Sequence, residues 1–150
     1  MGHIILKDGI DVYPKKIEAI REWLFPKNMI EVTSFMVLVG YYRSFIIGFL
    51  RIAHPITSFQ RKEKKFQWTK DCERSFQQLK QSLISAPILR IADMNEYFVV
   101  CPNACKEGLG GVLSQNGFVI CYESKKLKDH ERNYATHDLE LAAIIHALKK

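Results

Sequence analysis

The sequence EYFVVC (residues 96–101) opens the part of the chain that decides the fold. This segment and FVICYE (residues 118–123) are rich in the aromatic and β-branched residues that are typical of strands, and GGVLSQ (residues 110–115) lies between them. Asn116-Gly117 separates the last two segments, and this dipeptide is a strong signal for a type I′ hairpin turn. The pattern predicts three strands, the last two of them paired as a hairpin.

The sequence that follows the third predicted strand is typical of an amphipathic helix. Thr136 is a suitable N-cap residue, and Asp138 would lie in the first turn, where the helix dipole favours a carboxylate. Leu139, Ala143 and Ala147 recur at helical spacing and would form one apolar face. Residues 91–150 therefore predict a β-β-β-α unit.

The first part of the chain, residues 1–90, begins with a predicted hairpin. GHIIL and IDVY flank Lys7-Asp8-Gly9, in which Asp-Gly is a turn signal. Pro14 stands where a helix would begin, because proline is well tolerated in the first helical turn. The apolar spacing that follows predicts a helix that ends before Pro26.

Further helical patterns follow in this first part. Asn28 with Glu31 three residues later forms a capping-box signal, and the apolar face after it is expected to continue beyond Gly40 to Phe49. A short helix is expected over residues 52–59, with Pro55 near its first turn. Thr69 would cap one more helix, which ends before Pro87 and buries one apolar face formed by Cys72, Phe76, Leu79 and Leu83. The first part is therefore predicted to be mostly helical.

The positive charge of the chain is unevenly distributed. The 22 Lys and Arg exceed the 16 Asp and Glu, which gives a formal net charge of +6. The whole excess lies in residues 1–95, with a local basic run of Arg61, Lys62, Lys64 and Lys65. A basic region of this kind suits contact with phosphate groups, although a solvated surface gives the same pattern.

Other classes of protein fit the sequence poorly. The most apolar stretch (residues 35–50) contains Arg43 and is shorter than the ~20 residues that a membrane span requires. The first residues lack the pattern of a secretory signal, so an intracellular location and no membrane association are expected. Cys101 and Cys105, with His130 or His137, have spacings unlike those of common zinc motifs. Free thiols are the expected state of the cysteines.

One candidate site follows from the residues of the second part. Glu140 on the last predicted helix could face the end of the first predicted strand at Asn103. Nucleases that use two magnesium ions cluster anionic oxygens from a strand and a neighbouring helix, because these hard cations prefer such ligands. A single glutamate on a helix is more often simply solvated, so this pattern leaves both interpretations open.

Several long segments resemble the Pol polyprotein of Ty3/gypsy-type retrotransposons. PKNMIEVTSFMVLVGYYRSFI (residues 26–46) is similar to the PKNxxEVRSFLGLxGYYRRFI segment of its reverse-transcriptase thumb. GHIILKDGIDVYPKKIEAIREW (residues 2–23) resembles the end of the palm. FQWTKDCERSFQQLKQSLISAPIL (residues 66–89) resembles the connection helix, and residues 101–150 resemble the opening of the RNase H-like domain.

The resemblance implies an α+β fold: a helical thumb and connection module (residues 1–90), then a truncated RNase H-like β-β-β-α unit (residues 91–150). It also implies a catalytic magnesium site. In the family, an Asp on the first strand and a Glu on the helix bind Mg²⁺, and the matching positions here are Asn103 and Glu140. Asn103 lies in the string PNAC, where the family has a TDAS-type motif. A neutral amide at this position would weaken the binding of divalent cations.

Three further departures point in the same direction. The next catalytic Asp of the family would lie beyond residue 150, and the polymerase palm with its paired aspartates would precede residue 1. Val37 stands where the family has a glycine, and overpacking by about 1–3 kcal/mol is expected if that glycine allows two helices to approach closely.

The leading hypothesis is a retrotransposon-derived reverse transcriptase/RNase H fragment in which RNA-directed DNA synthesis and cleavage of RNA–DNA hybrids are lost. The alternative is a non-catalytic module that binds template–primer or single-stranded nucleic acid, using the basic first part and the aromatic residues Tyr41, Tyr42, Phe66 and Trp68. A third interpretation is a piece of a longer, active polyprotein. The partners implied are nucleic acid and the rest of Pol.

Overall fold

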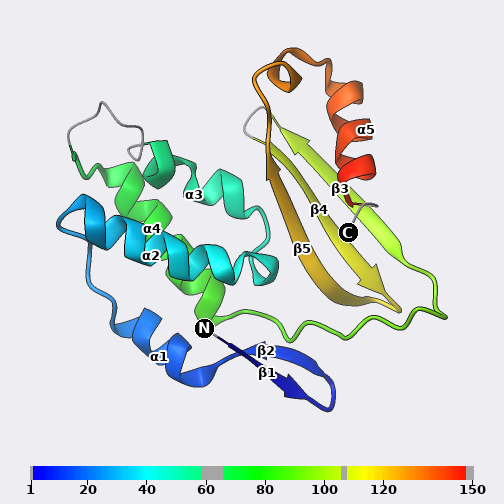
Figure 1. Cartoon of the computed structure of the whole chain (residues 1–150), viewed down its shortest axis with the longest axis horizontal. Coiled ribbons are helices and arrows are strands. Elements are labelled where there is room, and N and C mark those ends of the chain that lie inside the picture. The colour runs from blue at the N-terminus through cyan, green and yellow to red at the C-terminus, as the bar shows by residue number, and fades with distance from the viewer. Residues whose placement is uncertain (1, 59–65, 106–107, 148–150) are drawn as a thin grey trace.

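The fold is described by a computed structural model that covers residues 2–58, 66–105 and 108–147. The basic run at residues 61–65 lies outside these residues. A three-stranded sheet covered on one face by a helix forms one half of the molecule, and four helices with a two-stranded hairpin form the other (Figure 1). None of the helices described is both long and apolar enough to cross a membrane.

The three-stranded sheet is antiparallel, with strand order β3-β4-β5. Its strands are β3 (Val99–Cys105), β4 (Gly108–Gln115) and β5 (Phe118–Lys126). Asn116 and Gly117 have φ values of 52° and 79°, so both residues of the turn adopt the left-handed conformation that a type I′ hairpin requires. The predicted hairpin is confirmed.

The first strand of this sheet begins at Val99, three residues later than the predicted segment at Glu96. The side chain of Gln115 explains the difference. Its Nε2 donates to the carbonyls of Asp93 (2.7 Å) and Glu96 (3.1 Å), and its Oε1 accepts from the N–H of Asp93 (2.9 Å). This buried amide binds the backbone of the turn that would otherwise extend the strand.

Helix α5 (Thr136–Ala147) covers one face of the sheet. Leu139 and Ala143 are buried against Leu109 and Leu127 in a small core, as the helical spacing predicts. Thr136 is the first helical residue and not the N-cap, because the N–H of Leu139 donates to the carbonyl of Ala135 (3.1 Å). Asp138 lies in the first turn as predicted.

The segment between β5 and α5 is anchored by Glu131, which lies in the short 3-10 helix η3 (Glu131–Asn133). The buried carboxylate accepts hydrogen bonds from Lys125 Nζ (2.9 Å) and from the N–H of Lys128 (2.7 Å). The hydrogen bond from the Lys128 backbone, followed by that from the Lys125 side chain, lowers the pKa of Glu131 below its ordinary value of 4.5.

Replacing Glu131 with glutamine is expected to lower the free energy of unfolding by about 1–3 kcal/mol at neutral pH, because a hydrogen-bonded charge is lost. The carboxylate stabilises the fold above its ordinary pKa, and this contribution disappears as the pH falls through the lower folded pKa. Urea unfolding at neutral and acidic pH should show a gap between wild type and Glu131→Gln that narrows in acid. A gap independent of pH would contradict the assignment.

The N-terminal elements follow the prediction, except that the turn consists of Lys7 and Asp8 alone, because Gly9 already belongs to the second strand and pairs with Leu6. β1 (His3–Leu6) and β2 (Gly9–Val12) form the hairpin, and α1 (Pro14–Glu22) begins at Pro14. α2 (Met29–Tyr41) begins with the predicted cap, in which the N–H of Glu31 donates to Asn28 Oδ1 (2.9 Å). The Glu31 carboxylate accepts from Asn28 Nδ2 (2.8 Å) and from the N–H of Lys27 (2.8 Å).

The helical segment after Gly40 differs from the prediction. α2 ends at Tyr41, a 3-10 turn η1 (Arg43–Phe45) follows, and α3 (Phe49–Thr57) begins at Phe49. Gly48 adopts a left-handed conformation (φ 65°) that interrupts the helical path. The expectation of one continuous helical face was therefore wrong, although Phe45, Ile46 and Phe49 are buried in the core as their apolar pattern predicts. Pro55 lies near the end of α3 instead of in its first turn.

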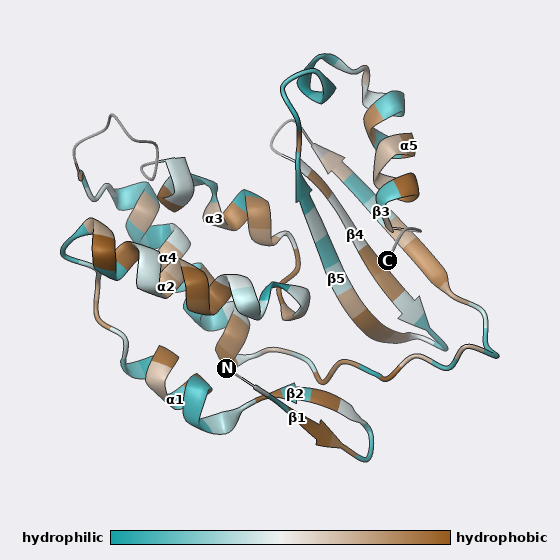
Figure 2. Cartoon of the chain, viewed as in Figure 1, coloured by the Kyte–Doolittle hydropathy of each residue, from teal (hydrophilic) through white to brown (hydrophobic). Residues whose placement is uncertain are grey.

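α4 (Lys70–Ile84) completes the helical half. Thr69 caps it as predicted, and its hydroxyl accepts from the N–H of Cys72 (3.3 Å). Phe76 is buried between Phe35 and Trp68 in the larger core, and brown hydrophobic residues recur along α2 and α4 in Figure 2. Val37 is 55% exposed, so the expected overpacking is wrong: its side chain meets solvent, not a second helix.

Two halves of the molecule are connected by the extended segment after α4. The N–H of Ile10 donates to the carbonyl of Leu89 (2.7 Å), and the N–H of Leu89 donates back to Ile10 (2.9 Å). The next residue, Arg90, donates its N–H to the carbonyl of Val119 in β5 (2.8 Å). This segment therefore binds the hairpin on one side and the sheet on the other.

Candidate functional site

Asn103 lies on β3, in register with Gly110 of β4, which in turn pairs with Ser124 of β5. Residues opposite each other in antiparallel strands point to the same face of the sheet. Gly108 lies on this face too, because a Cβ on it would stand 3.2 Å from Leu50 Cδ1 in α3. Asn103 is exposed and lines a hollow between the sheet and the start of α3, which Arg51 and Ser124 also line.

Glu140 lies on α5, which covers the other face of the sheet. Ala104, the neighbour of Asn103 in β3, packs against the core formed by Leu109 and Leu139. Because side chains alternate along a strand, Asn103 points away from this face. Glu140 is exposed beside the buried Leu139, and no contact recorded among the described residues joins it to Asn103. The side chain of Asn103 therefore lies on one face of the sheet, whereas the helix that carries Glu140 covers the other face.

Two of the four aromatic residues proposed for nucleic-acid binding, Tyr42 and Trp68, are packing residues. Tyr42 is buried, and its hydroxyl donates to the carbonyl of Gly2 (2.7 Å); burial raises its pKa. Trp68 packs edge-on against Phe76, with 6.0 Å between ring centroids. Tyr41 and Phe66 remain partly exposed.

Lys80 is a further cation with an internal role. Its Nζ donates to the carbonyls of Arg21 (2.9 Å) and Trp23 (2.7 Å) at the end of α1, and burial lowers its pKa. This ammonium group holds α1 against α4 and is directed away from solvent, so it is not available for phosphate contact.

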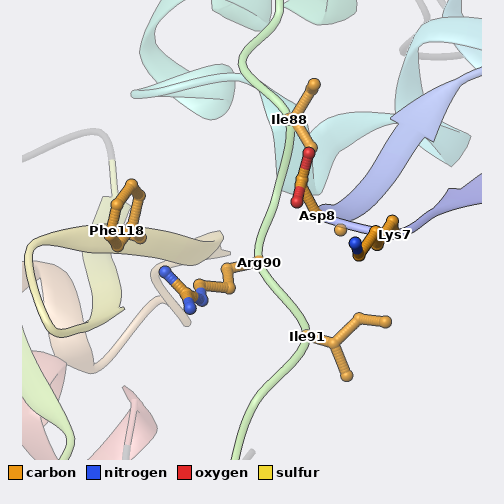
Figure 3. A pocket seen from close by; sticks show the side chains of 7 residues that line it. Lys7, Asp8, Ile88, Arg90, Ile91 and Phe118 are labelled. Carbon is orange, nitrogen blue, oxygen red and sulfur yellow. The ribbon is translucent and has the colours of Figure 1, made fainter.

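A second hollow, which the sequence did not reveal, lies where the hairpin, the connecting segment and the sheet meet (Figure 3). We call it the Arg90 pocket; it is lined by Lys7, Asp8, Gly9, Ile88, Arg90, Ile91 and Phe118. These residues are far apart in the chain and form no local motif. The hydrogen bonds of the segment after α4 with Ile10 and with Val119 bring them together.

Comparison with known proteins identifies the second half of the fold. The family described as "RNase H-like domain found in reverse transcriptase" matches residues 68–150. The chain belongs to this family. The match begins in front of α4, so it includes a helix that the sequence assigned to the connection; the boundary at residues 90 and 91 stays a prediction.

The relatives of this RNase H-like chain are retrotransposon polyproteins, which confirms the resemblance found in the sequence. The retrovirus-related Pol polyprotein from transposon 297 of Drosophila melanogaster is 41% identical over 150 residues, which are 99% of this chain and 14% of the relative. That from transposon gypsy of the same fly is 38% identical, over 100% of this chain and 16% of the relative. The chain thus spans about one seventh of the relatives' length.

Solved structures confirm the α+β fold. The foamy viral protease-reverse transcriptase in complex with RNA/DNA hybrid matches 99% of this chain and 21% of its own length, with a TM-score of 0.85 and 22% identity. The same enzyme in complex with dsDNA matches 100% of this chain and 32% of its own length, also with a TM-score of 0.85 and 22% identity. Nucleic-acid complexes are thus recorded for these structural neighbours.

RNase H-like domains typically use divalent metal, but the residues described here do not fit such a site. The described part of the chain contains no group of three or more His, Cys, Asp or Glu side chains that could hold a metal ion. Asn103 offers a neutral amide, and Glu140 lies on the helix that covers the opposite face. Two magnesium ions need several anionic oxygens within a few ångströms of one another.

Proposed function

We propose that this chain is a part of a retrotransposon Pol polyprotein that binds RNA–DNA hybrid or template–primer duplex without cleaving it. The observation that carries this proposal is Asn103, which occupies the position on β3 where the family resemblance implies a metal-binding Asp. An amide lends a neutral oxygen and no negative charge, so it compensates little of the charge of a divalent cation.

Binding is supported by the distribution of charge. The net charge of +6 lies in residues 1–95, which contain the thumb-like and connection-like first part, and Lys7, Lys15, Lys27 and Arg43 are exposed there. Phosphate contacts made by such side chains release counterions from the nucleic acid, so they give affinity that falls with salt. Such contacts do not catalyse cleavage, because they bind the phosphate backbone of the nucleic acid and do not activate water.

The test is one experiment on a fluorescein-labelled RNA–DNA hybrid. Fluorescence anisotropy should show that the chain binds the hybrid. The logarithm of the binding constant should fall linearly with the logarithm of the salt concentration. Gel analysis of the same mixture, incubated with Mg²⁺ or Mn²⁺, should show intact RNA, while a ribonuclease H control cleaves it. Circular dichroism and cooperative unfolding establish that the protein is folded.

Two results would overturn this proposal. Metal-dependent cleavage that Glu140→Gln abolishes would show that the site tolerates Asn103 and is active. Binding that is absent at low salt, or unaffected by salt, would remove the role of the basic first part.

A further inference from the structure

The Arg90 pocket combines cationic, aromatic and apolar groups in a way that the proposed function has not used. The guanidinium of Arg90 lies over the ring of Phe118, with 4.5 Å from Cζ to the centroid. Lys7 is exposed on the hairpin turn across the pocket, and Asp8 stands beside it (Figure 3). The lining thus carries two cations and one carboxylate, a balance of one positive charge.

The walls of the pocket are held in place by backbone hydrogen bonds. Leu89, between the lining residues Ile88 and Arg90, exchanges two hydrogen bonds with Ile10. The N–H of Arg90 donates to Val119, next to Phe118. Because these bonds hold all three segments, little ordering of the backbone would accompany the binding of a ligand.

The exposed apolar and aromatic surface here is suited to the flat face of a base. Phe118 is 55% exposed, and Ile88 and Ile91 are 48% and 53% exposed. Aromatic rings and the guanidinium planes of arginines are the groups on which unpaired bases stack in single-strand-binding proteins. Bases in a duplex are already stacked on both faces, so this surface favours a single strand over a double helix.

We infer that the Arg90 pocket binds one nucleotide of a single-stranded nucleic acid. The base stacks on the Arg90–Phe118 pair, and the Lys7 ammonium binds a phosphate of the strand. Asp8 limits the net charge of the pocket, so that stacking, and not charge alone, gives a large share of the affinity. This inference deepens the proposed function and rests on it, because it adds a single-strand contact to a protein proposed to bind duplex.

The test compares four variants by fluorescence anisotropy with a fluorescein-labelled dT12 strand at several salt concentrations. Phe118→Ala should weaken binding by about 5- to 150-fold, as the loss of one stacked base does, and leave the salt dependence unchanged. Phe118→Trp should bind at least as tightly as wild type. Lys7→Ala should weaken binding and lower the slope of log K against log salt by about 0.7, the loss of one phosphate contact on a single strand.

The matched control is Lys126→Ala, which removes an exposed lysine at the far end of β5, outside the pocket and outside the basic first part. Equal losses for Lys7→Ala and Lys126→Ala, or unchanged binding by Phe118→Ala, would overturn the inference. The labelled hybrid separates this failure from that of the proposed function. A wild-type chain that binds hybrid but not dT12 overturns the pocket alone, whereas a chain that binds neither overturns both.

Discussion

Replacing Phe76 with alanine is expected to lower the free energy of unfolding by about 3–5 kcal/mol. The side chain is 1% exposed, and its ring centroid lies 4.4 Å from that of Phe35, 5.2 Å from Phe25 and 6.0 Å from Trp68. Alanine would remove these contacts and leave a cavity that rigid neighbouring rings fill poorly. Urea unfolding followed by circular dichroism measures the loss.

The matched control for this change is the same substitution at an exposed site. Phe118→Ala alters a side chain that is 55% exposed, so it should change the free energy of unfolding by much less than 1 kcal/mol, beyond the small loss of its contact with Arg90. Equal effects at Phe76 and Phe118 would show that the helical half lacks the closely packed core described here.

The second large effect is expected for Gly9→Ala, which should lower the free energy of unfolding by about 2–6 kcal/mol. Gly9 has φ 151°, and a Cβ on it would stand 2.2 Å from the carbonyl oxygen of Leu89. Backbone strain of about 1–3 kcal/mol adds to the weakening of two hydrogen bonds between Ile10 and Leu89, each worth about 0.5–1.5 kcal/mol. Thermal unfolding measures the total.

Hydrogen exchange locates the effect of Gly9→Ala. The amides of Ile10 and Leu89 should lose protection, because the hairpin must move away from the connecting segment. Gly40→Ala is the control: among the described residues, no atom outside the helix itself lies within 4 Å of the added Cβ, and alanine favours a helix by up to about 1 kcal/mol. A Gly9→Ala protein as stable as Gly40→Ala would contradict the close approach of Gly9 and Leu89.

Local sequence signals predicted most elements correctly. Asn116-Gly117, the Asn28–Glu31 cap and the Thr69 cap each depend on atoms within a few residues, so their chemistry is decided by the local chain. Where a side chain distant in the sequence binds the same backbone groups, the local signal predicted the wrong strand boundary. The first strand of the large sheet begins late because Gln115 binds the backbone at Asp93 and Glu96.

The arrangement of the candidate sites could not be predicted from local sequence signals. Asn103 and Glu140 were identified by residue type and by resemblance, but which face of the sheet each one occupies depends on strand register and on where α5 packs. A shift of one residue in register would exchange the two faces. The Arg90 pocket depends still more on tertiary contacts, because its lining residues come from three separate segments.

The sequence by itself therefore determined the order of helices and strands, the family and the neutral residue at position 103, since each is written in a contiguous run of residues. The tertiary structure alone decided that Asn103 faces α3, that the helix begun at Met29 ends at Tyr41, and that Lys7, Arg90 and Phe118 share a pocket. The reason is physical: these features arise from packing and hydrogen bonds between segments distant in the chain, and no local periodicity encodes such contacts.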